Sequence, residues 1–137
     1  MMSGIRSRDT KPEMVIRSLL HRAGFRFRLH VSGMPGKPDL VLPRYRAAIF
    51  VNGCFWHGHG CRLFKWPATR EDFWREKIGR NVERDRKAVS KLVDEDWRCL
   101  TIWECAIRSG ADDPAFLSRI VDWIRNGEFV LEIGESS

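Results

Sequence analysis

The sequence predicts an α/β fold in which a mixed central sheet is flanked by helices. Three observations predict this class. Hydrophobic periodicity changes along the chain in the order helix, three strands, helices, strand, helix. The first three strands are joined by short connections that suit an antiparallel meander, and the long crossover before the last strand suits a parallel neighbour. A chain of 137 residues can bury one core, so a single domain over 1–137 is expected.

The first helix is expected from Thr10 to about Ala23. Thr10 and Glu13 form a capping-box pattern, and Gly24 is typical of a helix end. The apolar stripe of this helix places Glu13 on the buried side, so Glu13 is either a plain capping residue or a carboxylate held for chemistry. Residues 1–9 are polar and basic and are expected to form a flexible N-terminal arm.

Three strand-like segments follow this helix. Residues 25–31 alternate Phe and Leu with Arg and His, which predicts a half-buried strand. Residues 38–42 begin with Pro and Asp and continue as an apolar run, so Asp39 lies at a strand edge as either a turn residue or a functional carboxylate. The apolar run 47–51 predicts a buried strand that completes a hairpin with residues 39–42.

A loop rich in metal-ligand side chains follows the strand 47–51. Two cysteines and two histidines lie within eight residues, namely Cys54, His57, His59 and Cys61. Zinc prefers four ligands in a tetrahedron, and a closed set of four is structural. A distant fourth ligand is therefore expected. Cys105, just past a strand end, is a better candidate than Cys99 inside the strand, and on spacing alone His57 could replace His59.

The segment after this loop carries aromatic and basic side chains. A short helix is expected to begin near Thr69 and to carry Phe73 and Trp74, and Gly79 is a possible interruption. Basic residues then recur at spacings of three and four, which places them on one helical face. They are Lys77, Arg80, Arg84, Lys87 and Lys91. Such a face is either a solvated surface or a contact for a phosphate backbone.

The C-terminal third predicts one strand and one helix. Residues 97–103 are strongly strand-like and end at Glu104-Cys105. Asp113 as N-cap and Pro114 at the first helical position begin a helix that ends before Gly127. The tail from Glu128 carries no clear pattern.

Composition narrows the class of partner and the compartment. Lys and Arg number 24 against 18 Asp and Glu, for a net charge of +6, which suits a polyanionic partner. No apolar run approaches the roughly 20 residues that span a bilayer, and the N-terminus lacks the apolar region of a secretory signal. A cytoplasmic protein with no membrane partner is expected.

Four motifs together resemble those of the very-short-patch-repair (Vsr) mismatch endonucleases. They are PGKPDLVL, GCFWHGHGC, PATREDFWREKIGRNVERDR and WECA, and the likeness extends from about Ser7 to Ala106. The resemblance implies a restriction-endonuclease-like three-layer fold with a structural Zn²⁺. It also implies Mg²⁺-dependent nicking of double-stranded DNA 5′ of the thymine in T:G mismatches that arise by deamination of 5-methylcytosine. One active site making one nick suits a monomer.

The resemblance further implies a role for each matching residue. Asp39 is similar to the metal-binding aspartate, His57 to the catalytic histidine and Glu13 to the carboxylate of the first helix, with the Val51 carbonyl as a further magnesium ligand. The implied zinc ligands are Cys54, His59, Cys61 and Cys105. The implied DNA contacts are Phe55, Trp56 and Trp74 as a wedge, Met2 in the arm, Asn52 near the phosphate, and the basic residues Lys77, Arg80, Arg84 and Lys87.

The chain departs from the family pattern at two places. Val51-Asn52 stands where a Thr-His pair is familiar; the Val51 carbonyl can still bind a metal, but Asn52 removes an imidazole. The strand 47–51 also lacks Glu-x-Lys, so His57 has to do the work of the lysine. Two alternative functions fit the same features: a zinc-stabilised DNA-binding module without catalysis, and a related restriction-like nuclease of other specificity. A structural zinc protein with a protein partner is a third.

Overall fold

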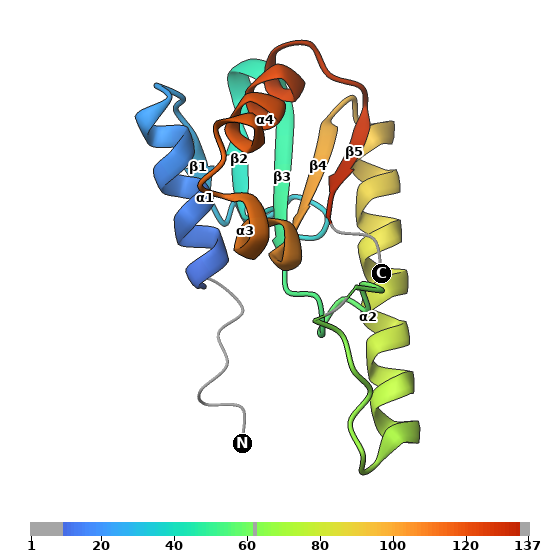
Figure 1. The fold of residues 1–137 in the computed structure, drawn as a ribbon. Helices are drawn as coiled ribbons and strands as arrows, with labels where there is room; N and C mark the ends of the chain where they lie inside the picture. Colours follow the sequence, from blue (N-terminus) through green and yellow to red (C-terminus); the bar gives the residue numbers. More distant parts are fainter. Residues whose placement is uncertain (1–9, 62, 135–137) are drawn as a thin grey trace.

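The computed structural model describes residues 10–61 and 63–134. Within them the chain forms one sheet of five strands in the order β1-β2-β3-β4-β5 (Figure 1). The strands are β1 (Arg28–Leu29), β2 (Leu40–Leu42), β3 (Ala47–Asn52), β4 (Arg98–Trp103) and β5 (Val130–Ile133). The first three pair antiparallel, and β3, β4 and β5 pair parallel. The predicted mixed sheet, with its meander and parallel neighbour, is confirmed.

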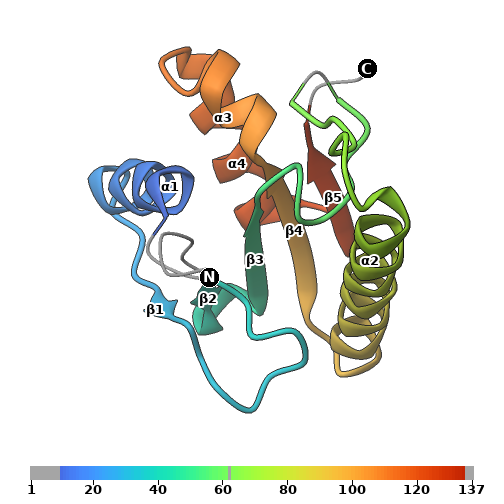
Figure 2. The same cartoon turned by 90° about the horizontal axis from the view of Figure 1, so that it is seen from below.

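Helices cover both faces of this sheet. Figure 2 shows α1 (Lys11–Arg22), α3 (Glu104–Gly110) and α4 (Pro114–Asn126) on one face and α2 (Glu71–Asp94) alone on the other. A short 3-10 helix, η1 (Pro43–Tyr45), joins β2 to β3. The result is the three-layer arrangement that was expected. No helix in the described part of the chain is long and apolar enough to cross a membrane.

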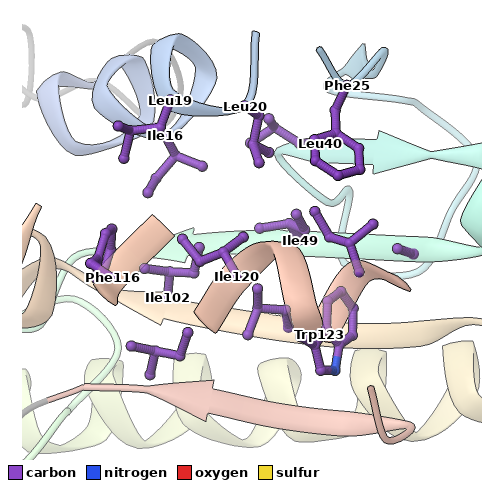
Figure 3. Close-up of a cluster of buried hydrophobic side chains, with 14 of the residues drawn as sticks. Ile16, Leu19, Leu20, Phe25, Leu40, Ile49, Ile102, Phe116, Ile120 and Trp123 are labelled. Carbon is purple, nitrogen blue, oxygen red and sulfur yellow. The ribbon is translucent and has the colours of Figure 1, made fainter. Parts of the chain in front are cut away.

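Two apolar clusters hold the three layers together. The larger one joins α1, α3 and α4 to the sheet, and Figure 3 shows Leu20, Ile49 and Ile120 among its members. The smaller one includes Ala48 of β3 and Leu92 of α2. Successive residues of a strand face opposite sides of a sheet, so β3 is packed on both faces. Full burial of a large apolar side chain contributes about 1.5–3 kcal/mol, so the end of β3 is firmly anchored.

Helix ends predicted from local signals are confirmed. Thr10 Oγ1 accepts a hydrogen bond from the Glu13 N–H at 3.3 Å, and Asp113 Oδ1 accepts one from the Ala115 N–H at 2.9 Å. These caps satisfy backbone donors that the first helical turn leaves without partners. They also fix where α1 and α4 begin.

Four predicted boundaries differ in the structure. The strand expected over 25–31 is only the two exposed residues of β1, which lie at the sheet edge. Helix α2 begins at Glu71 and runs unbroken through Gly79, where no heavy atom would meet an added Cβ; an exposed helical glycine costs about 1 kcal/mol and does not break the helix. Cys105 lies in the first turn of α3 rather than in a loop, and the unassigned tail contains β5.

Candidate active site and metal centre

Four side chains that can bind a metal meet where β3 ends and α3 begins. Their ligand atoms all lie within 4.8 Å of one another, and the group is Cys54, His59, Cys61 and Cys105. His59 Nδ1 lies 3.6 Å from Cys54 Sγ and 3.5 Å from Cys105 Sγ. Three buried thiols with one imidazole are a donor set for tetrahedral zinc. His57 is not part of this group, and Cys99 packs between β4 and α2 with its pKa raised to about 11 by burial.

Neighbouring side chains orient the His59 ring. The imidazole stacks on the Trp103 indole with centroids 4.2 Å apart and planes inclined by 9°. Trp103 Nε1 in turn donates a hydrogen bond to Glu132 Oε1 at 2.8 Å. Burial lowers the pKa of His59, which favours the neutral imidazole that binds a metal. The ring is therefore held ready as a ligand by β4 and β5.

The loop between β3 and α2 rests directly on α2. Gly58 has φ +65°, and a Cβ there would lie 2.9 Å from Ile78 Cγ2, so both the backbone conformation and the close approach require glycine. Asn81 Nδ2 donates a hydrogen bond to the Trp56 carbonyl at 3.0 Å. The loop is therefore fixed by the metal cluster on one side and by α2 on the other.

The same helix orients His57. His57 Nδ1 lies 2.5 Å from Asp85 Oδ2 on α2. An ionised carboxylate can only accept a hydrogen bond, so Nδ1 carries the proton and the Nε2 lone pair can accept another. This is the protonation state that a general base needs.

Three aromatic residues predicted to act together are brought together. Phe55 and Trp56 of the loop lie 5.5 Å and 5.7 Å from Trp74 of α2, measured between ring centroids. Phe55 also lies 5.1 Å from Trp56 in an edge-to-face arrangement, a favourable geometry for aromatic pairs. All three are partly exposed, so they form a rigid group of rings at the surface.

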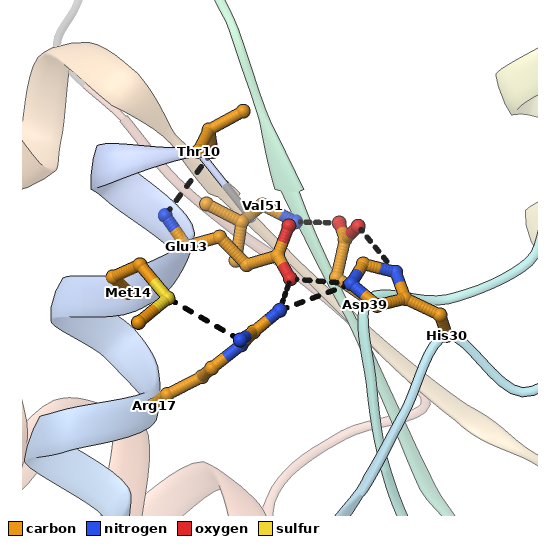
Figure 4. A network of polar contacts seen from close by, with 7 residues as sticks. All are labelled: Thr10, Glu13, Met14, Arg17, His30, Asp39 and Val51. Carbon is orange, nitrogen blue, oxygen red and sulfur yellow. Dashed lines mark hydrogen bonds and ion pairs between the residues drawn. The ribbon is translucent and has the colours of Figure 1, made fainter. Parts of the chain in front are cut away.

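Asp39 lies at the start of β2, next to the end of β3. Its Oδ2 accepts a hydrogen bond from the Val51 N–H at 2.7 Å (Figure 4). Burial raises the pKa of Asp39 to about 6, the Val51 hydrogen bond opposes this rise, and the charge of Glu13 adds to it. His30 and His57 lower the pKa of Asp39 through their charges, so both imidazoles are near enough to act on this carboxylate.

Glu13 reaches the same place from α1, with His30 from the end of β1. Glu13 is 1% exposed, which confirms its predicted position on the buried side of the helix. Its Oε2 pairs with Arg17 Nη2 and lies 2.7 Å from His30 Nε2 (Figure 4). His30 Nδ1 lies 3.9 Å from Asp39 Oδ1. Glu13, His30 and Asp39 thus form a second group whose ligand atoms lie within 4.8 Å of one another.

The remaining predicted site residues are less concentrated. Asn52 is 7% exposed at the end of β3. On α2 the basic side chains are exposed except for Lys77, which is half-buried, and Arg80 pairs with Glu76 at 2.6 Å. Met2 lies outside the described residues.

Sequence reasoning missed three residues of this region. They are Arg17, His30 and Asp85. Asp85 had a detectable signal, because it lies four positions after Asn81 and therefore on the helix face that meets the loop. The place of His30 depends on the antiparallel pairing of β1 with β2, in which the His30 N–H donates to the Asp39 carbonyl at 3.2 Å.

Comparison with known proteins places the chain in a family. The family model described as DNA mismatch endonuclease Vsr matches residues 1–63. The DNA mismatch endonuclease Vsr of Escherichia coli (strain K12) is 50% identical over 125 residues, which is 90% of this chain and 80% of that protein. The chain belongs to the Vsr DNA mismatch endonuclease family.

Other members of the Vsr family show similar coverage. The type II nicking enzyme V.XorIIP of Xanthomonas oryzae pv. oryzae is 45% identical, over 89% of this chain and 90% of that protein. V.NmeAIP of Neisseria meningitidis is 39% identical, over 92% and 90%. Among solved structures, the catalytic domain of the homing endonuclease I-Bth0305I aligns with a TM-score of 0.57 at 20% identity, over 85% of this chain and 97% of that one. The last comparison shows a shared endonuclease fold, which confirms the expected fold class for this Vsr-family chain.

Proposed function

We propose that the protein is a DNA mismatch endonuclease that nicks one strand 5′ of the thymine in T:G mismatches formed by deamination of 5-methylcytosine. Its relatives are named as a mismatch endonuclease and as nicking enzymes, and the chain contains an arrangement suited to phosphodiester hydrolysis. The observation that carries the proposal is the position of Asp39, which is held by the Val51 N–H at 2.7 Å beside Glu13 and near His57.

The carboxylate site fits a hard divalent cation. Asp39 is a buried carboxylate next to the charge of Glu13, and oxygen ligands of this kind suit Mg²⁺. Asp39 would hold the ion together with the Val51 carbonyl. A bound Mg²⁺ would stabilise charge on the phosphate oxygens and lower the pKa of a coordinated water.

His57 would act as the general base. Asp85 holds the proton on Nδ1, which leaves the Nε2 lone pair to take a proton from water. An unperturbed imidazole titrates near pH 6.5, close to the working range of such a base. Asp85 would therefore be a positioning residue for His57, and Glu13 would orient a water or hydrated ion at the same centre.

The aromatic group would enter the duplex beside the mismatch. Phe55, Trp56 and Trp74 are mutually packed and partly exposed. Stacking of a base on an aromatic ring contributes about 1–3 kcal/mol, and opening a duplex costs least at a mismatched pair. The cost of opening would thus favour T:G over a matched site, while the basic residues of α2 contact the phosphates.

Zn²⁺ would have a structural role in this enzyme. The set of Cys54, His59, Cys61 and Cys105 offers four ligands and so leaves no open position for chemistry. We further propose that the enzyme acts as a monomer in the cytoplasm, and that the arm with Met2 reaches the DNA.

The test is a nicking assay on duplexes with T:G or T:A pairs and randomised flanks, with and without Mg²⁺. We expect a single nick 5′ of the mismatched thymine that requires Mg²⁺. His57→Ala should lower the rate by about 10²–10⁴ and Asp85→Asn should also lower it, both with zinc content unchanged. Binding without nicking would favour the zinc-stabilised binding module, and cleavage of matched DNA would favour a restriction-like nuclease.

A further inference from the structure

His30 lies between two carboxylates, with one ring nitrogen facing each. Nε2 lies 2.7 Å from Glu13 Oε2 and Nδ1 lies 3.9 Å from Asp39 Oδ1. The first distance is that of a hydrogen bond and the second is too long for one. Since a carboxylate oxygen accepts, the proton of a neutral His30 ring belongs on Nε2, and the Nδ1 lone pair is directed towards Asp39.

The distance from Nδ1 to Asp39 Oδ1 suits two ligands of one cation. With bonds of about 2.1 Å, two ligand atoms of an octahedral ion lie about 3 Å apart when adjacent and about 4 Å apart when opposite. The observed 3.9 Å falls within this range. Asp39 Oδ2 is engaged by the Val51 N–H at 2.7 Å, which leaves Oδ1 turned towards the His30 ring.

Glu13 provides the support that such a histidine needs. Metal-binding histidines commonly donate their second ring N–H to a carboxylate, which fixes the tautomer and the ring orientation. Glu13 is 1% exposed and its charge is also met by Arg17, so this carboxylate is a fixed acceptor for Nε2–H. The His30 backbone is fixed as well, because its N–H donates to the Asp39 carbonyl at 3.2 Å.

We propose that His30 Nδ1 and Asp39 Oδ1 are paired ligands of the catalytic divalent cation, and that the imidazole makes this centre prefer Mn²⁺ to Mg²⁺. The inference rests on the proposed nuclease function and adds a ligand to its centre. Imidazole nitrogen suits first-row transition metals, whereas Mg²⁺ favours oxygen and water ligands. A site with one nitrogen and one carboxylate therefore discriminates between the two ions through its nitrogen.

The test measures Mn²⁺ binding to the full chain from the electron paramagnetic resonance signal of free Mn²⁺, with Mg²⁺ binding measured by competition. The variant is His30→Asn, because His30 has φ +47° and asparagine is among the residues that tolerate this conformation. We expect the Kd for Mn²⁺ to rise about tenfold or more and the Kd for Mg²⁺ to rise by a smaller factor. His21→Asn, on the exposed end of α1, is the matched control and should bind both ions as the parent chain does.

Zinc content is measured in every sample, so that Mn²⁺ held by the cysteine cluster is not counted. If His30→Asn does not fold by circular dichroism, His30→Gln supplies the same comparison. An unchanged Kd for Mn²⁺, or equal losses for both ions, would overturn the inference. Absence of nicking by the parent chain with either ion would overturn the proposed function instead, and the Mn²⁺ titration would still decide whether His30 is a ligand.

Discussion

Asp39 is held where its own negative charge is unfavourable. Burial is the main cause of its pKa of about 6, against an ordinary value of 3.8. Because the folded pKa is raised, the folded chain holds more protons than the unfolded chain between about pH 3.8 and 6. Stability therefore falls as pH rises through this window and stays at the lower level above it. A divalent cation beside Asp39 would offset this cost.

Asp39→Asn should therefore stabilise the fold while abolishing nicking. Asparagine has nearly the same shape, and its Oδ1 can still accept the Val51 N–H. In buffer at pH 7.5 without added Mg²⁺, the free energy of unfolding should rise by up to about 3 kcal/mol, and the gain should shrink towards pH 4. Urea unfolding at several pH values measures it, with the exposed Asp112→Asn as control. A loss of stability at pH 7.5, or a gain independent of pH, would contradict this account of the site.

At the scale of residues, the sequence predicted what depends on near neighbours. The stripe of the first helix predicted the burial of Glu13, and the Pro-Asp start of an apolar run predicted Asp39 at a strand edge. The place of His30 could not be predicted, because it depends on which residues of β1 and β2 pair. Arg17 and His30 meet Glu13 only after that pairing is fixed.

At the scale of elements, local caps decided what could be predicted. Helices α1 and α4 begin with side-chain caps and were found at their correct starts. Helix α3 has no side-chain cap, and α2 begins after Arg70 in a left-handed conformation without one, so neither start carries a sequence signal. Strands β1 and β5 are short and lie at the two sheet edges. Their pairing with neighbours, rather than their own pattern, makes them strands.

The loop after β3 and helix α2 act as one unit in presenting the aromatic rings, and Trp56 tests this. Trp56→Ala should weaken binding to T:G duplex by about 1–3 kcal/mol and binding to matched duplex by less, since a base must be unstacked for the ring to enter. Fluorescence anisotropy at fixed salt measures both affinities. Phe129, an aromatic residue 54% exposed next to β5, provides the control Phe129→Ala. Equal losses on the two duplexes would mean that Trp56 only packs against Trp74 and Phe55.

At the scale of the whole molecule, the cysteine cluster joins parts of the chain that are far apart in sequence. Cys54, His59 and Cys61 come from the loop after β3, and Cys105 comes from the first turn of α3 after β4. The sequence predicted that a distant fourth ligand was needed. It left His57 and His59 as alternatives, because equal chemistry at close spacing cannot be separated until the Trp103 ring and α2 fix where each imidazole lies.

Cys105→Ala should show how far the fold depends on this cluster. It removes the ligand that ties α3 to the loop, so zinc should be lost, the melting temperature should fall, and the loop with Phe55, Trp56 and His57 should become open to proteolysis. The loss of stability should reach several kcal/mol, part of the about 10–16 kcal/mol that structural zinc contributes in small zinc domains. Metal analysis, thermal unfolding and limited proteolysis measure the three effects. Cys99→Ala is the control, because Cys99 is 1% exposed but packs against Leu92 and Ala48; it should keep zinc and lose only packing energy. Full zinc in Cys105→Ala, or loss of zinc in Cys99→Ala, would mean that the fourth ligand lies elsewhere and that α3 is held to the sheet by its apolar contacts alone.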